Sequence, residues 1–458
     1  MVTRYYLIVE NSFELVFGGS IGTVTSHWRK EANILRKFLK EIFSSTIGKS
    51  SAVMDLAKKI DSCVMGYEYG STKALSASTP GKPAFPGQID GLPFGVNVAG
   101  YLTGEFGLGE AGRADIRCLQ KVGVPYAANN FAVSNHSSMD TSIRDFSKNN
   151  PYIFNLVHIN MDKIDEFASA WGEPYFNGRH NIAYWVWELS SFPETYDGAF
   201  RRFNEIWTPS SFSMDAISMV SPVPVVRVPH AVEVDSSAMP NRIYFGLPED
   251  KFVFLMVFDF YSLLGRKNPL GAVRAFRKAF EGEKGVVLVI KHINAKADLG
   301  QLSILEKELR GLQIVEFKNH MRKREVNSLM ASCDCYVSLH RSEGFGLTIA
   351  EMMAIGKPVV ATGYSGNMDF MNLNNSFPVR YKLIELEQDI LPYKKGNIWA
   401  EPDEDHAAEL MRLVFKNKKQ RERISVEAAK TIEAEFSPEV VGKRYRERLL
   451  RIKNLKGF

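Results

Sequence analysis

The sequence predicts an α/β protein with two doubly wound domains, each a parallel sheet covered by helices on both faces. Two series of continuous apolar segments carry this prediction, one beginning at Phe94 and the other at Phe252. In both series the apolar segments alternate with helical patterns, and strands that are apolar throughout belong to sheets buried on both sides. The chain has 458 residues, which is enough for two or three domains with substantial cores.

The first series defines a predicted domain at residues 91–240. It opens with the strand-like segment FGVNVAGYL, a glycine-rich turn and the helical pattern GEAGRADIRCLQKVG. The strand-like segments that follow are YIFNLVHIN, NIAYWVWEL and VPVVRVPHAV, at 152–160, 181–189 and 223–232. Aromatic residues beside an acid, such as Trp185, Trp187 and Glu188, are compatible with carbohydrate stacking. Their strict alternation favours a plain strand packed in the core.

The second series defines a predicted domain at residues 241–430. One helix, NPLGAVRAFRKAF at 268–280, follows its first strand. Its strand-like segments are FVFLMVFDF, GVVLVIKHI, QIVEFKNH, DCYVSLH and KPVVATGY, at 252–260, 285–293, 313–320, 334–340 and 357–364. The remaining residues, 431–458, are predicted to form a closing helix with Ser437 at the N-cap and Pro438 at the first helical position.

Residues 1–90 differ from the rest and are predicted to be a mainly helical N-terminal extension with a linker rich in Ser, Pro and Gly. Within them, residues 28–59 carry eight Lys or Arg against three acids, a local net charge of +5. Apolar residues recur there at helical spacing. Such a basic amphipathic helix either packs on a neighbouring domain, the favoured interpretation, or lies on a membrane surface.

Composition excludes several classes of protein. A net charge of +5 with a pI of about 8.8 is too mild to indicate a nucleic-acid partner, and no recognition motif is present. Four cysteines in so long a chain make no disulfide framework, and Cys333 and Cys335 are expected to be buried thiols. No apolar run reaches the roughly 18 residues of a membrane span, and no signal peptide is evident. We therefore expect a cytoplasmic protein, with peripheral contact at the inner face of the cell membrane if residues 28–59 bind lipid.

The first glycine-rich turn has the pattern G-x-G-x-x-G, formed by Gly107, Gly109 and Gly112 after a strand and before a helix. Glycines allow backbone amides to approach a phosphate, and the helix N-terminus adds positive potential. A dinucleotide site also needs an acid about 20 residues further on, but the segment there, PYAANNF, has none. The turn is therefore predicted to meet a phosphate or to be a purely structural turn, and NAD is not expected.

A second glycine-rich turn, at 342–346, lies between a strand and a helix and carries Glu343, with Glu351 one turn into the helix. Loops at the carboxyl ends of parallel strands bind ligands, and free amides at the helix N-terminus suit a diphosphate. The two carboxylates are better partners for hydroxyl groups. Together they predict a ligand with hydroxyls on both sides of a diphosphate, as in a nucleotide sugar.

The segment EGFGLTIAE at 343–351 resembles the signature of family-four (group 1) glycosyltransferases, which are retaining enzymes of GT-B architecture. The resemblance covers roughly residues 92–430 and includes EFGLGEAGR, WTPSSF, RKNPLGAVRAF and ATGYSGN in the expected order. It implies two Rossmann-like domains facing across a cleft, the N-terminal one holding the acceptor and the C-terminal one the nucleotide sugar.

The same resemblance implies roles for individual residues. Glu343 would contact hydroxyls of the transferred sugar, Glu351 would hold the ribose, and His158 would lie near the donor sugar. Lys267 would bind the diphosphate together with Arg266, because the position where the family usually has its arginine is Ser262. The loop residues implied to surround the sugar and diphosphate are Gly107, Leu108, Gly109, Gly344, Phe345, Gly346, Leu347 and Thr348.

The sequence thus predicts a retaining hexosyltransferase that uses a nucleotide-diphosphate sugar and a glycan or lipid-linked acceptor in polysaccharide biosynthesis. No Asp-x-Asp metal motif lies in a suitable loop, so we expect neither a metal ion nor another cofactor. The alternatives are a nucleotide-sugar epimerase or hydrolase on the same fold, or a non-catalytic scaffold in a polysaccharide-assembly complex. The intact glutamates and glycine turns argue against the scaffold.

Overall fold

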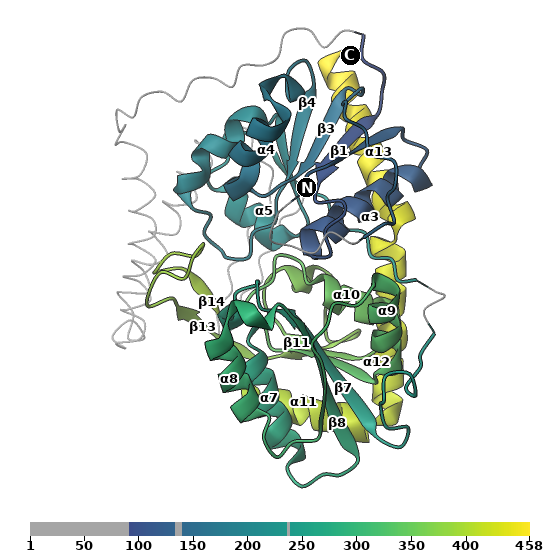
Figure 1. Cartoon of the computed structure of the whole chain (residues 1–458), viewed down its shortest axis with the longest axis vertical. Helices are drawn as coiled ribbons and strands as arrows, with labels where there is room; N and C mark the ends of the chain where they lie inside the picture. The colour runs from purple at the N-terminus through teal and green to yellow at the C-terminus, as the bar shows by residue number, and fades with distance from the viewer. Residues whose placement is uncertain (1–90, 133–139, 236–238) are drawn as a thin grey trace, which may run out of the picture. The chain divides into compact units, whose positions relative to one another are not determined.

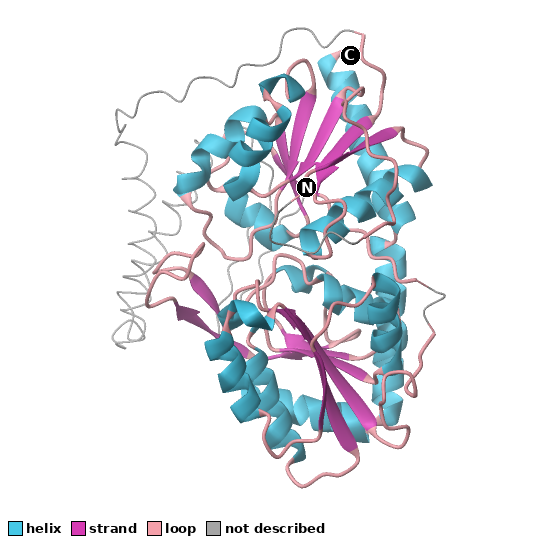
Figure 2. Cartoon of the chain, in the orientation of Figure 1, coloured by secondary structure: helices cyan, strands magenta, loops and turns pink. Residues whose placement is uncertain are grey.

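The structure, a computed structural model, describes residues 91–132, 140–235 and 239–458, all within one compact unit of the chain, residues 83–458. The predicted helical extension at 1–90, with its basic segment at 28–59, lies outside the described residues. Figure 1 colours the chain by residue number from the N-terminus to the C-terminus, and Figure 2 distinguishes helices from strands. The predicted fold class is confirmed: two parallel sheets, each flanked by helices.

The first sheet, as far as the structure describes it, has six strands in the order β2-β1-β3-β4-β5-β6, all parallel. They are β1 (Val96–Gly100), β2 (Tyr126–Asn130), β3 (Phe154–His158), β4 (His180–Tyr184), β5 (Glu205–Thr208) and β6 (Val225–Arg227). Its helices and 3-10 turns are α3 (Gly107–Lys121), η2 (Met161–Lys163), α4 (Ile164–Trp171), η3 (Glu173–Tyr175), η4 (Glu194–Arg202) and α5 (Ser211–Ser218).

The second sheet, counted over the same described ranges, also has six parallel strands, in the order β12-β11-β10-β7-β8-β9. They are β7 (Phe252–Asp259), β8 (Val286–Ile293), β9 (Ile314–Phe317), β10 (Cys335–Ser338), β11 (Val359–Thr362) and β12 (Phe377–Val379). Its helices and turns are α6 (Leu264–Lys267), α7 (Pro269–Phe280), η5 (Ala295–Ala297), α8 (Leu299–Glu308), α9 (Lys323–Ser332), α10 (Leu347–Ala354), η6 (Gly366–Asp369), α11 (Glu404–Lys416) and α12 (Lys418–Phe436). An antiparallel hairpin, β13 (Tyr381–Glu385) and β14 (Ile398–Pro402), follows β12.

Buried side chains cover both faces of each sheet, as the continuous apolar strands predict. In β3, for example, Leu156 belongs to one buried cluster and Val157 to the cluster on the opposite face. Cys333, at the C-cap of α9, and Cys335 of β10 are buried free thiols, which confirms their expected burial.

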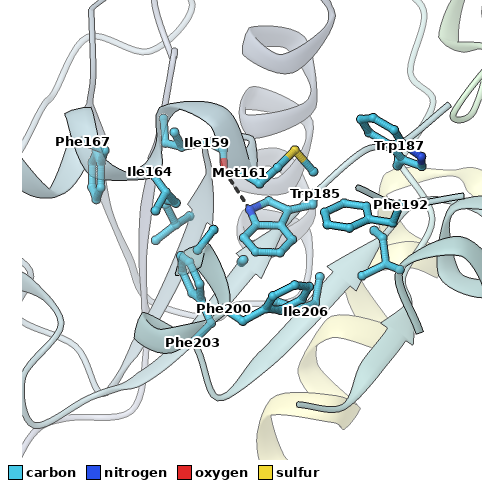
Figure 3. Packing of buried hydrophobic residues seen from close by; sticks show 14 of the residues in the cluster. Ile159, Met161, Ile164, Phe167, Trp185, Trp187, Phe192, Phe200, Phe203 and Ile206 are labelled. Carbon is cyan, nitrogen blue, oxygen red and sulfur yellow. Dashed lines mark hydrogen bonds between the residues drawn. The ribbon is translucent and has the colours of Figure 1, made fainter. Parts of the chain in front are cut away.

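The segment predicted as a strand at 181–189 is a strand only as far as Tyr184. Trp185, Trp187 and Leu189 are nevertheless buried, so their alternation reflects burial in an irregular segment and the strand prediction is wrong beyond 184. Figure 3 shows Trp185 among the aromatic rings of this core, with its indole N–H donating to the Ile159 carbonyl at 3.0 Å. Without that acceptor the buried N–H would cost about 1–3 kcal/mol.

The last helix, α13 (Pro438–Lys456), begins with Ser437 at the N-cap position and Pro438 at the first turn, as predicted, although the Ser437 side chain makes no capping hydrogen bond. The residues before it, 431–436, belong to α12. Residues of α13 such as Tyr445 are part of the core of the first sheet. The helix passes close to α3, because a Cβ at Gly442 would lie 2.6 Å from the Cys118 carbonyl oxygen.

Candidate active site

A cavity of about 510 Å³ lies at the carboxyl ends of β7, β8 and β10, where an open parallel sheet binds ligands. Its lining also includes residues of the first domain, from the start of α3 and from the segment after β4. Most of the residues that the sequence singles out line this cavity. They are Gly107, Leu108, Arg266, Lys267, Glu343, Gly344, Phe345, Gly346, Leu347, Thr348 and Glu351.

The loop between β10 and α10 forms one wall of the cavity. Gly346 precedes α10 with a φ of +94°, a conformation that glycine accepts without strain, and no side chain caps the helix. The first amides of α10 are therefore available to a ligand. At Gly344 the loop packs tightly on the first domain, because an added Cβ would lie 3.3 Å from the Trp187 carbonyl oxygen and closer still to Val186. Loop and first domain thus define the cavity together.

Glu343 lies between two cations. Lys267 Nζ is 2.5 Å from Glu343 Oε1, and Arg266 Nη1 is 3.3 Å from Glu343 Oε2. Burial alone would raise the pKa of Glu343, but Lys267, Arg266 and His340 outweigh it and lower the pKa to about 2. The Glu343 side chain is thus a fixed carboxylate at neutral pH.

The segment 361–367 holds the backbone of Glu343 in place by hydrogen bonds. Ser365 Oγ accepts a hydrogen bond from the Glu343 amide at 2.8 Å, and the Gly366 amide donates to the Glu343 carbonyl at 2.9 Å. A Cβ at Gly366 would lie 2.8 Å from that carbonyl oxygen and closer still to the Gly344 carbonyl. Glycine at 366 is therefore required by the close approach of two backbone segments, and this gives the motif ATGYSGN a physical role.

Glu351 has a partner that sequence reasoning missed, Lys323 at the start of α9. The Lys323 ammonium contacts the Glu351 carboxylate and also faces Glu110 of α3. Burial lowers the pKa of Lys323, but the two glutamates outweigh it and raise the pKa above its ordinary value. Glu110 itself has a pKa of about 2, because Lys323, Arg117 and Arg113 overcome the effect of its burial. The ammonium is thus held between carboxylates of the two domains.

Replacing Lys323 by methionine removes this ammonium and frees the Glu351 carboxylate to move. If Glu351 holds a part of the donor that does not change during the reaction, we expect Lys323→Met to raise KM for the donor about tenfold, with kcat nearly unchanged. Steady-state kinetics measure both constants. Lys318→Met is the matched control, since Lys318 is an exposed lysine that also faces two glutamates. Equal KM values for the two variants would contradict the prediction.

The glycines of the first turn have different roles. Gly107 lines the cavity, and a Cβ there would meet nothing within 4 Å. Gly109 does not line it: a Cβ at Gly109 would lie 2.7 Å from the Tyr101 carbonyl oxygen and closer still to the Gly104 carbonyl. In this structure Gly109 instead allows α3 to pack closely on the preceding loop.

His158, expected near the donor sugar, is not among the residues that line the cavity. The ring is fully buried, with Nε2 2.5 Å from Asp115 Oδ2, and it stacks on Tyr184 at 4.4 Å. The Tyr445 hydroxyl of α13 donates to the other oxygen of Asp115 at 2.6 Å. His158 therefore joins α3, β3 and α13 in the core of the first domain.

Asp115 is the common acceptor of this buried group. Asp115→Ala leaves the His158 and Tyr445 groups buried without their acceptor, and we expect it to lower the free energy of unfolding by about 3 kcal/mol. Urea denaturation measures the change. Asp215→Ala removes an exposed aspartate from α5 and serves as control, with an expected change within about 0.5 kcal/mol. Similar values for both variants would show that the buried group contributes nothing to stability.

Two further residues line the cavity: His230, which sequence reasoning missed, and Glu188, which it assigned to a plain strand. His230 lines the cavity, and its ring lies edge-on to Phe345 at 5.2 Å. It also stacks on Tyr184, the same ring on which His158 stacks. Burial lowers the pKa of His230 to about 3, so its imidazole is neutral. Glu188 lines the cavity too, 3.6 Å from Arg266 and accepting from the Tyr393 hydroxyl at 3.1 Å.

Two parallel-sheet domains of this kind are typical of the GT-B fold, and the comparison with solved structures confirms this fold. The Anabaena protein HepE in complex with UDP and glucose matches with a TM-score of 0.58 at 14% identity, over 78% of this chain and 100% of that one. Sucrose-phosphate synthase from Thermosynechococcus elongatus matches with a TM-score of 0.57 at 11% identity, over 79% of this chain and 100% of that one. A glycosyltransferase from Rickettsia africae has a TM-score of 0.56 at 15% identity, over 78% and 97% of the two chains.

The sequence comparison finds a match to one family model, in the second domain. Residues 241–431 match the family model "Glycosyl transferases group 1", which confirms the resemblance predicted from EGFGLTIAE. A trehalose synthase from Pyrococcus horikoshii is 29% identical over 106 residues, which are 22% of this chain and 26% of that protein. This chain therefore matches about a quarter of that curated relative's length.

Proposed function

We propose that the chain is a retaining glycosyltransferase that transfers a hexose from a nucleotide-diphosphate sugar to a hydroxyl acceptor. The observation that carries the proposal is the constellation at α10: a buried carboxylate, Glu343, held by two cations beside an uncapped helix N-terminus. This combination suits a ligand whose diphosphate needs positive charge and whose sugar needs a fixed hydrogen-bond acceptor. The group 1 family match of the same domain supports it.

The diphosphate would lie against the first amides of α10 and within reach of Lys267. Charge grows on it as the bond to the anomeric carbon breaks, and preorganised donors in a water-poor cavity stabilise such charge best. Arg266 is 6% exposed and bonded to the Ser342 carbonyl at 2.8 Å, as well as to Glu343. In this proposal it holds Glu343 in place, and Lys267 is the more mobile of the two charges.

Glu343 would accept hydrogen bonds from hydroxyls of the transferred hexose, and Glu351, fixed by Lys323, from the ribose. The acceptor hydroxyl oxygen attacks the anomeric carbon as the carbon–oxygen bond to the diphosphate breaks. Attack on the same face retains the configuration, and the departing phosphate oxygen takes the acceptor proton. No protein nucleophile, metal ion or other cofactor is required by this sequence of events.

The acceptor is proposed to be a glycan or a lipid-linked saccharide in polysaccharide biosynthesis, bound mainly by the first domain. None of the helices in the described part of the chain is both long and apolar enough to span a membrane. Peripheral contact through residues 28–59 remains part of the proposal, with vesicle binding of the full chain as its direct measurement.

A panel of nucleoside diphosphates and their sugars tests the proposal, starting with UDP and UDP-glucose because HepE has been solved in complex with them. A true donor stabilises only the folded state and raises the melting temperature. Product analysis then compares reactions with and without saccharide acceptors, in buffer with EDTA, and NMR reads the anomeric configuration. Turnover without acceptor would instead indicate an epimerase or hydrolase, and binding of no nucleotide sugar would favour the scaffold.

A further inference from the structure

The cavity holds one cation that differs from the others. Arg113 lies 3.0 Å from Glu110, Arg266 3.3 Å and Lys267 2.5 Å from Glu343, and Lys323 contacts Glu351. Lys291 of β8 lines the same cavity, yet within the described ranges no carboxylate lies within 4.0 Å of its ammonium. Among the described residues its ammonium makes one hydrogen bond, a long one of 3.4 Å to the carbonyl of His292.

Lys291 is 4% exposed, so this ammonium is almost fully removed from water. Burial of a charge without a partner is unfavourable, and proteins usually pair such groups or neutralise them. Lys291 lies on the strand beside β7, in register with Val257, which also lines the cavity. The positive charge therefore points to an anion supplied by a ligand.

The titratable groups around Lys291 do not meet this demand. Asp259 is the last residue of β7, and its Oδ1 already accepts from the Asn294 amide group at 2.8 Å and from the Tyr261 backbone at 2.9 Å. His292 is its neighbour on β8, and the cavity residues His320 and Lys323 follow β9. Burial lowers the pKa of Lys291 to about 8, and Asp259 only partly opposes this.

We propose that Lys291 binds the diphosphate of the nucleotide substrate and is the positioning residue whose charge remains unpaired until that anion arrives. The inference rests on the proposed function, since it assigns a further contact within the same donor site. It also separates two kinds of cation in the ligand-free cavity: Arg266, Lys267 and Lys323 are paired with carboxylates, whereas Lys291 is not.

The test uses the full chain with Lys291→Met and two ligands, inorganic pyrophosphate and UDP, measured by calorimetry. Loss of one charge-assisted contact is expected to weaken binding of both ligands at least about tenfold. The ligand-free variant is expected to melt at an equal or higher temperature, because an unpaired buried charge has been removed. A merely structural lysine predicts the opposite, a lower melting temperature. Lys291→Arg should recover part of the affinity.

Lys296→Met is the matched control, because Lys296 is an exposed lysine five residues away and outside the cavity. It removes the same net charge and should leave both affinities unchanged. Proton linkage provides an independent readout. An anion beside Lys291 raises the pKa of its ammonium from about 8, so UDP binding at pH 8 should take up a fraction of a proton in the parent and less in Lys291→Met. UDP affinity should accordingly fall as pH rises above 8.

Three results would overturn the inference. Unchanged UDP and pyrophosphate affinity in Lys291→Met would show that Lys291 touches neither. A lower melting temperature of the ligand-free variant would show a structural role. If the parent protein binds neither pyrophosphate nor any nucleoside diphosphate, both this inference and the proposed function fail. If the parent binds them and Lys291→Met binds them equally well, only this inference fails.

Discussion

Glu343→Gln is expected to lower kcat by about 100-fold while free UDP binds as tightly as to the parent, or more tightly. The first effect follows from the proposed contact with the transferred hexose, whose ring gains positive charge as the bond to phosphate breaks. A fixed carboxylate there stabilises the transition state more than the ground state, and about 2.7 kcal/mol corresponds to 100-fold. Because the pKa of Glu343 is about 2, its charge is present throughout the neutral range and is lost only in strong acid.

The second effect follows from the ion pairs. In the ligand-free site Glu343 neutralises Lys267 and Arg266, at 2.5 and 3.3 Å. A glutamine keeps the shape of the side chain but is neutral, so the charges of both cations are available to the diphosphate. Opposite signs for catalysis and product binding distinguish this role from simple damage to the loop, which would weaken both.

Glu404→Gln is the control for Glu343→Gln. Its carboxylate also faces an arginine and a lysine, Arg274 at 2.6 Å and Lys278 at 3.6 Å, on the outside of the same domain. Steady-state kinetics and calorimetry with UDP are made on both variants. If Glu343→Gln retains kcat within twofold of the parent, Glu343 does not act on the reacting sugar.

The sheets could be predicted because most of their strands are apolar on both faces, a pattern that few other structures produce. Strand β2 escaped because its sequence, YAANN, is half polar. Its Asn129 is fully buried and donates to the Ser147 and Asn149 carbonyls at 2.9 and 3.0 Å. Partners of this kind lie elsewhere in the chain, so hydropathy alone cannot reveal such a strand. The error at 185–189 has the converse origin, since alternating burial does not require a strand.

The predicted site residues that the structure brings together share one property: they belong to short segments whose local pattern places them at a strand end. Contacts between residues far apart in the sequence could not be predicted in this way. Lys323 lies 28 residues before Glu351, within a basic stretch typical of a solvated surface, and only the packing of α9 beside α10 makes it a partner. Lys291 could not be recognised because it lies in a strand that is apolar except for Lys291 and His292.

His158 and Gly109 show the limit of motif reasoning. Both occupy the expected positions in sequence, His158 at the end of β3 and Gly109 in the first glycine turn. The direction in which a residue faces depends on neighbours that the motif does not contain. His158 contacts Asp115 in the core, and the carbonyls of the 101–104 loop face Gly109. Two histidines that do line the cavity are His230, 72 residues further along the chain, and His320.

The role of segment 361–367 leads to the second large effect, expected for Gly366→Ala. The added methyl group would lie 2.8 Å from the Glu343 carbonyl oxygen and closer still to Gly344, so backbone rather than a flexible side chain must move. The movement displaces the Glu343 carboxylate and the amides at the start of α10 together. Misplacement of catalytic groups by about 1 Å is enough for a loss of roughly 100-fold, and we expect at least this loss in kcat/KM.

Gly363→Ala provides the control from the same segment, since its Cβ would meet Pro378 and Val379 at 3.3 Å, a distance that a small shift can relieve. Both variants are assayed well below their melting temperatures, so that global unfolding does not contribute. Gly363→Ala should retain most of its activity. In Gly366→Ala, UDP binding should weaken along with catalysis, because the α10 amides move with Glu343; this separates it from Glu343→Gln, in which binding is kept. A Gly366→Ala protein with parental kcat/KM would mean that the loop carrying Glu343 tolerates displacement, and the fixed geometry on which the proposed chemistry depends would then be wrong.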